Sequence, residues 1–384
     1  MKKILMTKSP LKITIVGPAH PFRGGIALGN ERLANEFQIM GHEVNIITFT
    51  TQYPDFLFPG KTQYSTAKAP SNLKIERKLS SVNPLNWIKV GREIKKAKPD
   101  IVIFRYWLPF MGPCFGTIGR IIKRNKHTKI ITILDNVIPH ESRIGDKQFT
   151  KYFIKPNDGF IAMSRSVAKD LKTFTNTTCL YNPHPLFDNY GPKYNQNAAK
   201  NYLNLDVNLK YVLFFGLVRD YKGLDLLLKA FQQFDYKKYG VKLLVAGEYY
   251  ANEEEYRLLI DELGLKDVVI VKNEFIKDEE VGYYFSAAEI IAQPYKSATQ
   301  SGVTQIAYHF ETPMLVTNVG GLPEMVPHEK VGYVVERDPI QIKDALDNYF
   351  TENRTAEFQA NFAPEKDKFT WDKMAIKVIE LAKK

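Results

Sequence analysis

The sequence predicts an α/β fold made of two Rossmann-like, doubly wound domains. Short apolar strands alternate with helical patterns from residue 12 onward, as in a parallel sheet with crossover helices. A polar stretch at 186–208, rich in Asn, Tyr, Pro and Lys, then shows little periodicity. The alternation restarts with the apolar run at 210–215. We therefore expect two similar domains, with the boundary near residue 188.

The first half opens with a β-α-β unit. A strand is expected at 12–16, a helix at 26–40 and a second strand at 42–48, and the loop after the first strand carries Arg23, Gly24 and Gly25. These glycines do not fit G-x-G-x-x-G, which argues against a nicotinamide site. A loop rich in Pro, Tyr and Phe follows at 51–71. Helices are then expected at 85–98 and 116–125, and strands at 101–104, 129–134 and 159–163.

Two polar residues follow the strand at 129–134. His140 and Glu141 come a few residues after its carboxyl end. In a doubly wound sheet the carboxyl ends of the strands face the ligand crevice, so both residues are candidates for a site. The alternative is a surface histidine that pairs with its neighbour.

In the second half, strands are expected at 210–215, 241–246, 268–271, 289–292, 314–317 and 332–335. Helices are expected at 224–231, 254–263, 278–288, 342–350 and 370–383, with another beginning near Val303. The loop after the first of these strands carries Arg219 and Lys222. Two cations between a strand and a helix suit a diphosphate.

Residues 293–324 combine three signals. A polar loop leads from a strand into the helix that begins near Val303, and the next strand ends in Gly320-Gly321. A helix N-terminus offers N–H groups and the positive end of its dipole to a phosphate, and a Gly-Gly turn lets backbone approach a ligand. An ordinary β-α-β unit with common glycine turns is the alternative.

Composition restricts the class of protein. The 384 residues, 44% hydrophobic and 25% charged, are ordinary for a globular protein with sizeable cores. The two cysteines, Cys114 and Cys179, have no metal-type spacing, which favours a reducing cytoplasm over a disulfide framework. No apolar run is long enough for a transmembrane helix, and the N-terminus is a poor signal peptide because Lys8 and Pro10 interrupt it.

The net charge of +11 is unevenly distributed. Residues 1–185 hold 29 Lys and Arg against 12 Asp and Glu, a net +17, whereas the remainder holds 24 against 30, a net −6. This asymmetry predicts an anionic partner for the first half, such as an anionic membrane surface, a phosphate-bearing substrate or nucleic acid. The alternatives are a solvated basic surface and, for the aromatic residues among these charges, simple core packing.

Four segments resemble the family 4 glycosyltransferases. They are PFRGGIALGNERLANEF, FFGLVRDYKGLDLLLKAF, PYKSATQSGVTQIA with TPMLVTNVGGLPEMV, and the closing FTWDKMAIKVIEL, in family order along nearly the whole chain. The resemblance implies the GT-B fold, with two Rossmann-like domains facing a central cleft and a last helix that crosses back. It places an acceptor-binding domain at 1–188, a nucleotide-sugar domain at 189–365 and the returning helix at 366–384.

The resemblance also implies an enzyme that transfers a sugar from a nucleotide-sugar, of UDP or GDP type, with retention and without a metal or other cofactor. The net +17 of the first half and its basic helices predict that the acceptor is a lipid-linked saccharide or growing polysaccharide at the cytoplasmic face of an anionic membrane. By resemblance the catalytic candidates are His140, Arg219 and Lys222, and the acceptor-binding candidates are Arg23, Gly24 and Glu141. The donor-binding candidates are Gly25, Gly216, Glu248, Phe275, Ile276, Thr299, Gln300, Ser301, Gly302, Val303 and Gln305.

Two departures from the family pattern affect the site. Most members carry Glu-x7-Glu in the segment that corresponds to 293–324, but this chain has no Glu between Glu289 and Glu311. Gln305 lies near the place of the second Glu, where an amide could still bond to ribose hydroxyls. Asp135 stands where many relatives have His, which leaves His140 as the candidate histidine.

Two other functions remain as alternatives. A GT-B sugar-nucleotide epimerase would use a similar donor site, although the closing helix and the Tyr-Lys-Gly loop favour family 4. A non-enzymatic polyanion-binding protein would use the basic half, but it leaves the paired phosphate loops without a role. No nucleic-acid-binding module is recognisable, so no nucleic acid partner is expected.

Overall fold

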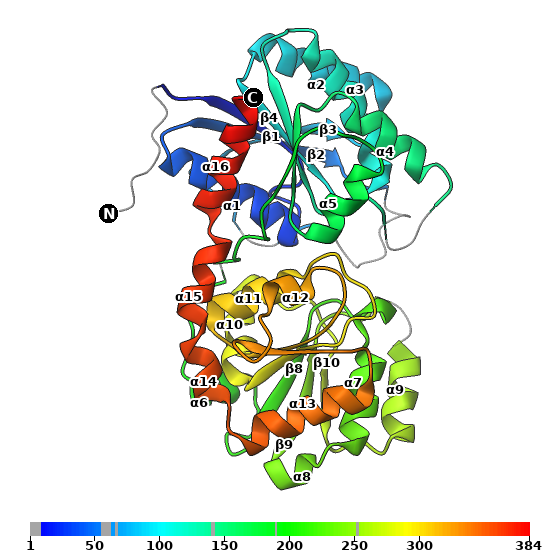
Figure 1. Cartoon of the computed structure of the whole chain (residues 1–384), viewed down its shortest axis with the longest axis vertical. Coiled ribbons are helices and arrows are strands. Elements are labelled where there is room, and N and C mark those ends of the chain that lie inside the picture. The colour runs from blue at the N-terminus through cyan, green and yellow to red at the C-terminus, as the bar shows by residue number, and fades with distance from the viewer. Residues whose placement is uncertain (1–8, 55–62, 66–67, 140–142, 189, 251–252) are drawn as a thin grey trace. The chain divides into compact units, whose positions relative to one another are not determined.

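The computed structural model describes residues 9–54, 63–65, 68–139, 143–188, 190–250 and 253–384. The chain divides into two compact units (Figure 1). Unit 1 holds the described residues up to Pro185 together with Thr370–Lys384, and unit 2 is Leu186–Phe369. Each unit is a parallel sheet with helices on both faces, as the alternation of strands and helices predicts.

Unit 1 contains a parallel sheet in the order β3-β2-β1-β4-β5-β6-β7. The strands are β1 (Lys12–Val16), β2 (Glu43–Thr51), β3 (Lys74–Ser80), β4 (Ile101–Tyr106), β5 (Lys129–Leu134), β6 (Gly159–Ala162) and β7 (Cys179–Tyr181). The helices are α1 (Gly25–Ile39), α2 (Pro84–Ala97), α3 (Gly112–Lys123), α4 (Asp146–Ile154), α5 (Arg165–Lys172) and α16 (Trp371–Ala382), and the short 3-10 helix η2 (Pro109–Met111) precedes α3.

Alternate residues of the unit 1 strands face opposite sides of the sheet. Ile101 and Ile103 of β4 pack towards α1 and α16, whereas Val102 and Phe104 pack towards α2, α3 and α4. Apolar residues on both sides explain why these strands read as continuous hydrophobic runs. Both faces of the sheet are therefore buried by helices.

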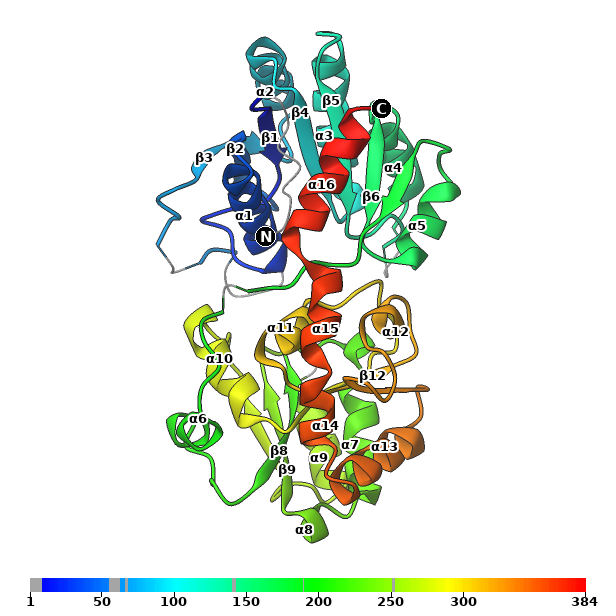
Figure 2. The same ribbon diagram turned by 60° about the vertical axis from the view of Figure 1, so that its left-hand side comes forward.

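Helix α16 returns from the end of the chain to the sheet of unit 1. Its buried stripe contains Met374 and Val378, which pack with residues of β5 and β6 and with α1 (Figures 1 and 2). Gly159 of β6 lets the helix approach, because a Cβ there would stand 3.2 Å from Leu381. Lys377 Nζ donates to the Tyr181 carbonyl at 2.7 Å. The last helix therefore belongs to the core of the first unit.

Unit 2 has a parallel sheet in the order β10-β9-β8-β11-β12-β13. Its strands are β8 (Lys210–Phe215), β9 (Val241–Ala246), β10 (Val269–Lys272), β11 (Ile290–Gln293), β12 (Met314–Thr317) and β13 (Gly332–Val335). Its helices are α6 (Gln196–Tyr202), α7 (Leu224–Gln233), α8 (Tyr236–Tyr239), α9 (Glu253–Glu262), α10 (Asp278–Ala287), α11 (Gly302–Phe310), α12 (Leu322–Met325), α13 (Pro339–Thr351), α14 (Thr355–Ala360) and α15 (Phe362–Lys366), with 3-10 turns η3 (Asp220–Lys222) and η4 (Asp367–Phe369).

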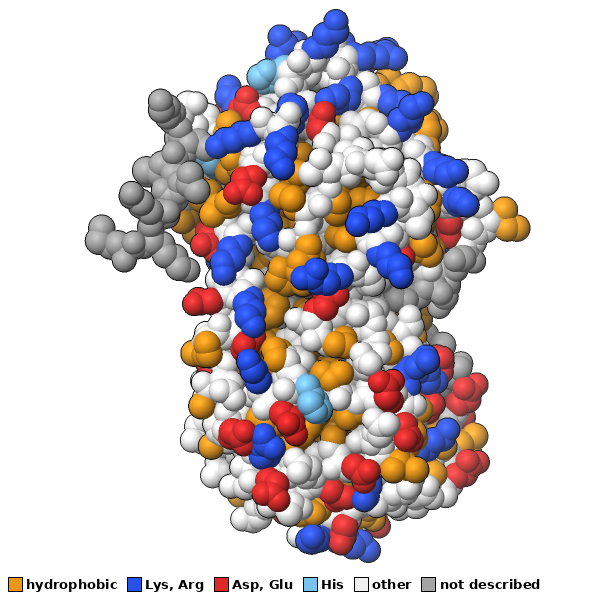
Figure 3. Space-filling view, viewed as in Figure 1, with side chains coloured by type: hydrophobic (Ala, Val, Ile, Leu, Met, Phe, Trp, Pro, Cys, Tyr) orange, Lys and Arg blue, Asp and Glu red, His pale blue; other side chains and the backbone are white. Residues whose placement is uncertain are grey.

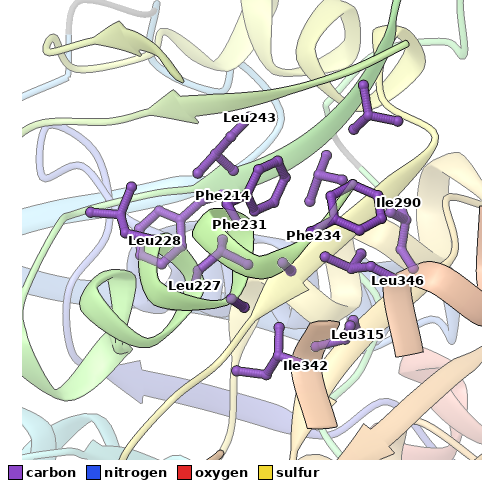
Figure 4. Close-up of a cluster of buried hydrophobic side chains, with 14 of the residues drawn as sticks. Phe214, Leu227, Leu228, Phe231, Phe234, Leu243, Ile290, Leu315, Ile342 and Leu346 are labelled. Carbon is purple, nitrogen blue, oxygen red and sulfur yellow. The ribbon is translucent and has the colours of Figure 1, made fainter. Parts of the chain in front are cut away.

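A large hydrophobic core of unit 2 lies between the sheet and helices α7 and α13. Figure 4 shows Phe214 of β8 and Leu315 of β12 among Leu227 and Phe231 of α7 and Leu346 of α13, and all are buried. Burying a side chain of this size contributes roughly 1.5–3 kcal/mol. This packing fixes the strand β8 and the start of α7, and with them the loop that joins the two.

The structure differs from the sequence prediction at several elements. Strand β3, strand β7 and helix α4 are additional, and α3 starts earlier than predicted, at Gly112, with a proline in its first turn. The stretch 186–208 was predicted to be an irregular linker, but it contains α6, which packs on α10 within unit 2. The side chains of Tyr194 and Tyr202 stack on Tyr283 of α10 and hold it there.

Candidate functional site

The strand order defines the position in each sheet at which a ligand is expected to bind. In unit 2 the order reverses between β8 and β11, and in unit 1 between β1 and β4. In open parallel sheets, ligands bind outside the carboxyl ends of the strands at such a reversal. In unit 2 the two loops at this position are 216–223, after β8, and 294–301, after β11. The first holds Arg219 and Lys222, and the second holds the predicted phosphate loop.

The loop after β8 folds its lysine back over its own start. Gly216 has a φ of 95°, and Lys222 Nζ lies 3.1 Å from the point that a Cβ on residue 216 would occupy. Gly247, at the end of β9, lies so close that a Cβ there would come within 2.1 Å of the Gly216 carbonyl oxygen. Glycine is needed at both positions because a side chain would meet its neighbours. These glycines therefore let the start of the loop pack against the end of β9 and lie directly beside Lys222 Nζ.

The two loops are tied together by backbone and ionic contacts. A Cβ on Gly223 would stand 2.0 Å from the Pro294 carbonyl oxygen, and Lys296 N donates to the Tyr221 carbonyl at 2.7 Å. Lys296 Nζ forms ion pairs with Asp220 at 2.6 Å and with Asp225 at 3.0 Å. These contacts hold the segment that carries Arg219 and Lys222 in one position.

Lys222 and Arg219 form a pair of adjacent cations. Lys222 is buried beside the Tyr295 ring, 5.6 Å from its centroid, and the Arg219 guanidinium stacks on Tyr250 at 3.7 Å. Burial, and to a smaller extent the charge of Arg219, lower the pKa of Lys222 to about 8. An anion placed between these groups would relieve both effects.

Helix α11 begins next to this pair. Ser301 is its N-cap, and Ser301 Oγ accepts from Val303 N at 3.2 Å and donates to Gln293 Oε1 at 2.6 Å. A Cβ on Gly216 would lie 3.8 Å from Val303 Cγ2, so the first turn of α11 faces the loop of Lys222. The first-turn N–H groups and the helix dipole add positive potential to the two cations.

The remaining loops close around the same edge. A Cβ on Gly320 would come within 1.5 Å of the Ala298 carbonyl oxygen, so the Gly-Gly turn after β12 lies directly on the segment of Thr299 and Gln300. Val218 N donates to the Glu248 carbonyl at 2.9 Å, which places the buried Glu248 beside the Arg219 loop. The structure thus brings together Gly216, Arg219, Lys222, Glu248, Thr299, Gln300, Ser301, Gly302 and Val303.

Three further predicted donor-binding residues of unit 2 are Gln305, Phe275 and Ile276. Gln305 is fully buried, with Nε2 directed at Met325 Sδ at 3.7 Å and Oε1 without a hydrogen-bond partner. A ribose contact would therefore require its side chain to leave this position. Phe275 is exposed and Ile276 buried, and they follow Asn273, which accepts from Tyr249 N at 3.1 Å next to Glu248.

In unit 1 the loop after β1 carries the predicted acceptor-binding residues. Gly24, with φ 107° and ψ 166°, adopts a conformation that only glycine tolerates, and it precedes α1. Arg23 N donates to the Gln63 carbonyl at 3.0 Å, and a Cβ on Gly24 would meet open space. Gly25 is the first residue of α1. His140 and Glu141 lie outside the described residues.

A buried ion pair at the same edge of unit 1 was missed by the sequence prediction. Arg105, at the end of β4, donates through Nε and a terminal nitrogen to the two carboxylate oxygens of Asp135 at 2.5 and 2.8 Å. Both side chains are buried. The signal was present in the sequence, since an arginine in the apolar run IVIFRY needs a buried partner. Asp135 is held in place by this arginine.

His184 lies near this pair and was also missed. Its Nδ1 is 2.7 Å from the Pro185 carbonyl oxygen, so that nitrogen carries the proton because a carbonyl only accepts. Burial, followed by the charge of Arg105, lowers the pKa of His184 to about 4. The imidazole is therefore neutral at physiological pH.

Comparison with known proteins identifies the family of the chain. Residues 23–183 match the model of "Glycosyltransferase Family 4", and residues 195–368 match that of "Glycosyl transferases group 1". The chain belongs to the family 4 glycosyltransferases. The two matches follow the two units described above.

Relatives of this glycosyltransferase cover different shares of its length. It is 23% identical to an uncharacterized glycosyltransferase of Methanocaldococcus jannaschii, over 97% of this chain and 98% of the relative. It is 25% identical to the D-inositol 3-phosphate glycosyltransferase of Streptomyces scabiei, over 64% of this chain and 57% of that protein.

Solved structures show that this glycosyltransferase has the GT-B fold. Sucrose-phosphate synthase from Thermosynechococcus elongatus superposes with a TM-score of 0.73 at 17% identity, over 97% of this chain and 98% of the other. Anabaena HepE in complex with UDP superposes with a TM-score of 0.74 at 15% identity, over 96% of this chain and 99% of the other. In the described part of the chain, no helix is both long and apolar enough to cross a bilayer.

Proposed function

We propose that this glycosyltransferase moves a sugar from a UDP- or GDP-sugar to a lipid-linked or polysaccharide acceptor, with retention at the anomeric carbon, in the synthesis of cell-surface glycans. The observation that carries the proposal is the pair Arg219 and Lys222, which is fixed beside the first turn of α11 in unit 2. A diphosphate is the anion that two adjacent cations and a helix N-terminus suit best. The complex of Anabaena HepE with UDP supports this choice of ligand.

In this mechanism the two cations act on the leaving group. As the glycosidic bond to the diphosphate breaks, negative charge develops on the diphosphate oxygens. Arg219 can donate two hydrogen bonds from its planar guanidinium, and Lys222 adds a compact charge, so together they stabilise that charge. Both are held in place before the substrate arrives, which lowers the reorganisation needed during the reaction. We propose that these side chains make a metal ion unnecessary.

The acceptor is proposed to bind to unit 1, with Arg23 and Gly24 contacting it. Arg23 and Gly24 end the loop that joins β1 to α1. This loop follows the carboxyl end of β1, next to the reversal of strand order. His140 and Glu141 follow β5 in the sequence, and we propose that His140 contacts the donor sugar and Glu141 the acceptor. We place the enzyme in the cytoplasm, peripherally on the inner face of the cell membrane.

A panel of UDP- and GDP-sugars tests the proposed reaction. Each is incubated with the enzyme and a membrane lipid extract, with and without EDTA, and the products are separated by mass. We expect one donor to yield a glycosylated lipid and free nucleoside diphosphate, at the same rate with EDTA. An epimerised nucleotide-sugar formed without any acceptor would contradict transfer. A lost rate in EDTA, restored by a divalent cation, would contradict the metal-independent mechanism.

Binding of UDP is expected to take up a proton around pH 8–9. The pKa of Lys222 is about 8 in the free protein, so a fraction of the amine is neutral in this range. The diphosphate favours the ammonium and raises this pKa, so affinity falls as pH rises through 8. Calorimetric titration of UDP in buffers of different ionisation enthalpy measures the proton uptake. The Lys222→Arg variant stays charged and should take up no proton, and equal uptake in both proteins would refute this prediction.

A further inference from the structure

One face of helix α4 in unit 1 exposes apolar side chains to solvent. Ile144, just before the helix, is fully exposed, and Phe149 and Tyr152 are exposed by 41% and 39%. The opposite face, with Thr150, Phe153 and Ile154, is buried against the core. Exposed apolar side chains that lie together on one element can mark an interaction site. We call Ile144, Phe149 and Tyr152 the apolar edge of α4.

Cations surround the apolar edge. Lys147, Lys151 and Lys155 follow one another at four-residue intervals along the exposed side of the helix, and Arg143 precedes it. The only carboxylate in 143–155 is Asp146, which is half-buried and accepts from Arg143 N at 2.8 Å. The exposed face therefore combines apolar side chains with positive charge and presents no exposed carboxylate.

The helix is held firmly enough to present this face. Gly112 and Gly116 of α3 let α4 approach, because a Cβ at either would come within 2.5 Å of the Phe149 carbonyl oxygen or of the Tyr152 ring. The Arg120 guanidinium stacks on that ring at 3.7 Å, and Thr117 Oγ1 lies 3.1 Å from the Tyr152 hydroxyl. Tyr152 is fixed from one side, whereas Ile144 and Phe149 project outward.

We infer that the apolar edge of α4 docks onto an anionic lipid bilayer. A short amphipathic helix with apolar side chains flanked by lysines fits the boundary between headgroups and acyl chains. The charge supports this partner, because unit 1 carries 33 Lys and Arg against 14 Asp and Glu. A second copy of the chain would bring the same lysines against each other, and lysine is depleted in protein–protein interfaces. Figure 3 shows many Lys and Arg side chains on the visible face of unit 1.

The position of the apolar edge of α4 fits a lipid-linked acceptor. Phe149 lies against the start of α3, which follows the carboxyl end of β4, and Ile144 belongs to the chain segment that follows β5. Both strands end at the edge of the sheet where the acceptor is proposed to bind. A docked α4 would keep the saccharide of a lipid-linked acceptor near that edge while its tail stays in the bilayer. This role rests on the proposed function, and the docking specifies the surface that would make the proposed membrane contact.

Flotation with lipid vesicles tests the docking. The full chain, without nucleotide, is mixed with vesicles of phosphatidylcholine alone or with added phosphatidylglycerol. We expect binding to the anionic vesicles only, weakened at high salt. The variant Ile144→Ser/Phe149→Ser should bind about tenfold or more weakly, because both side chains lose their burial in the bilayer. The control Ile340→Ser changes an apolar residue of unit 2 that is 54% exposed, and this variant should bind like the wild type.

Three results would overturn the inference. These are unchanged vesicle binding in the double variant, an equal loss in Ile340→Ser, and a wild-type dimer in sedimentation that the double variant abolishes. Ile144 is fully exposed, but part of the Phe149 ring is buried, so thermal midpoints are measured for both proteins and vesicle binding is compared at a temperature where both are folded, which separates docking from folding. Sugar transfer could fail for every donor while vesicle binding persists, so the two proposals fail separately.

Discussion

Replacement of Lys222 by methionine is expected to lower the rate of sugar transfer by about a hundred- to a thousandfold. The lysine supplies a charge that stabilises the leaving diphosphate, and methionine keeps most of the volume without the charge. The same change should leave the thermal midpoint of the protein unchanged or raise it. The ammonium is buried beside Arg219, and burial lowers its pKa, so the free protein carries an unfavourable charge at this position.

Two measurements separate catalysis from folding in this experiment. Initial rates are compared for the wild type, Lys222→Met, Lys222→Arg and Lys210→Met, and thermal unfolding is followed by calorimetry with and without UDP. Lys210 is the first residue of β8, whereas the loop that carries Lys222 follows the last residue of this strand. Loss of Lys210 should therefore leave the rate intact. Lys222→Arg should retain part of the rate, and UDP should stabilise Lys222→Met less than the wild type. A Lys222→Met protein with a lowered midpoint and a normal rate would show that the lysine is structural.

Much of the fold could be predicted because its signals are local. Runs such as the strand at 210–215 are apolar on both faces and are followed by a loop and a helix. The missed elements lack such signals. Strand β3 is mostly polar, with Leu79 as its one buried residue, and β7 is three residues long and only partly buried. Helix α4 has an exposed apolar edge that blurs its periodicity.

The candidate site could be predicted in part. Arg219 and Lys222 were visible as cations in a loop between a strand and a helix. The contacts that fix them, from Pro294 to Gly223 and from Lys296 to Asp220, join residues about 70 positions apart, and no local pattern indicates them. The orientation of Gln305 was equally hidden, since its contact with Met325 depends on how the turn after β12 folds over α11.

Replacement of Asp135 by alanine is expected to lower the free energy of unfolding of unit 1 by about 3–5 kcal/mol. The change leaves the Arg105 guanidinium buried without the carboxylate that accepts its two hydrogen bonds. The double variant Arg105→Met/Asp135→Leu removes both charges and should recover most of that loss, because an apolar pair of similar volume has no desolvation penalty. The two variants therefore distinguish an unpaired charge from a simple loss of packing.

Tryptophan fluorescence can follow unit 1 alone during denaturation by urea. The three tryptophans, Trp87, Trp107 and Trp371, all belong to that unit, so unfolding of unit 2 does not contribute to their signal. This separation matters because a two-unit chain need not unfold in one step. We expect the midpoint for Asp135→Ala to fall well below that of the wild type, and that of the double variant to lie between them or above. If Asp135→Ala unfolds like the wild type, the ion pair does not stabilise unit 1. Its role would then be contact with the substrate at the carboxyl ends of the unit 1 strands, where the acceptor is proposed to bind.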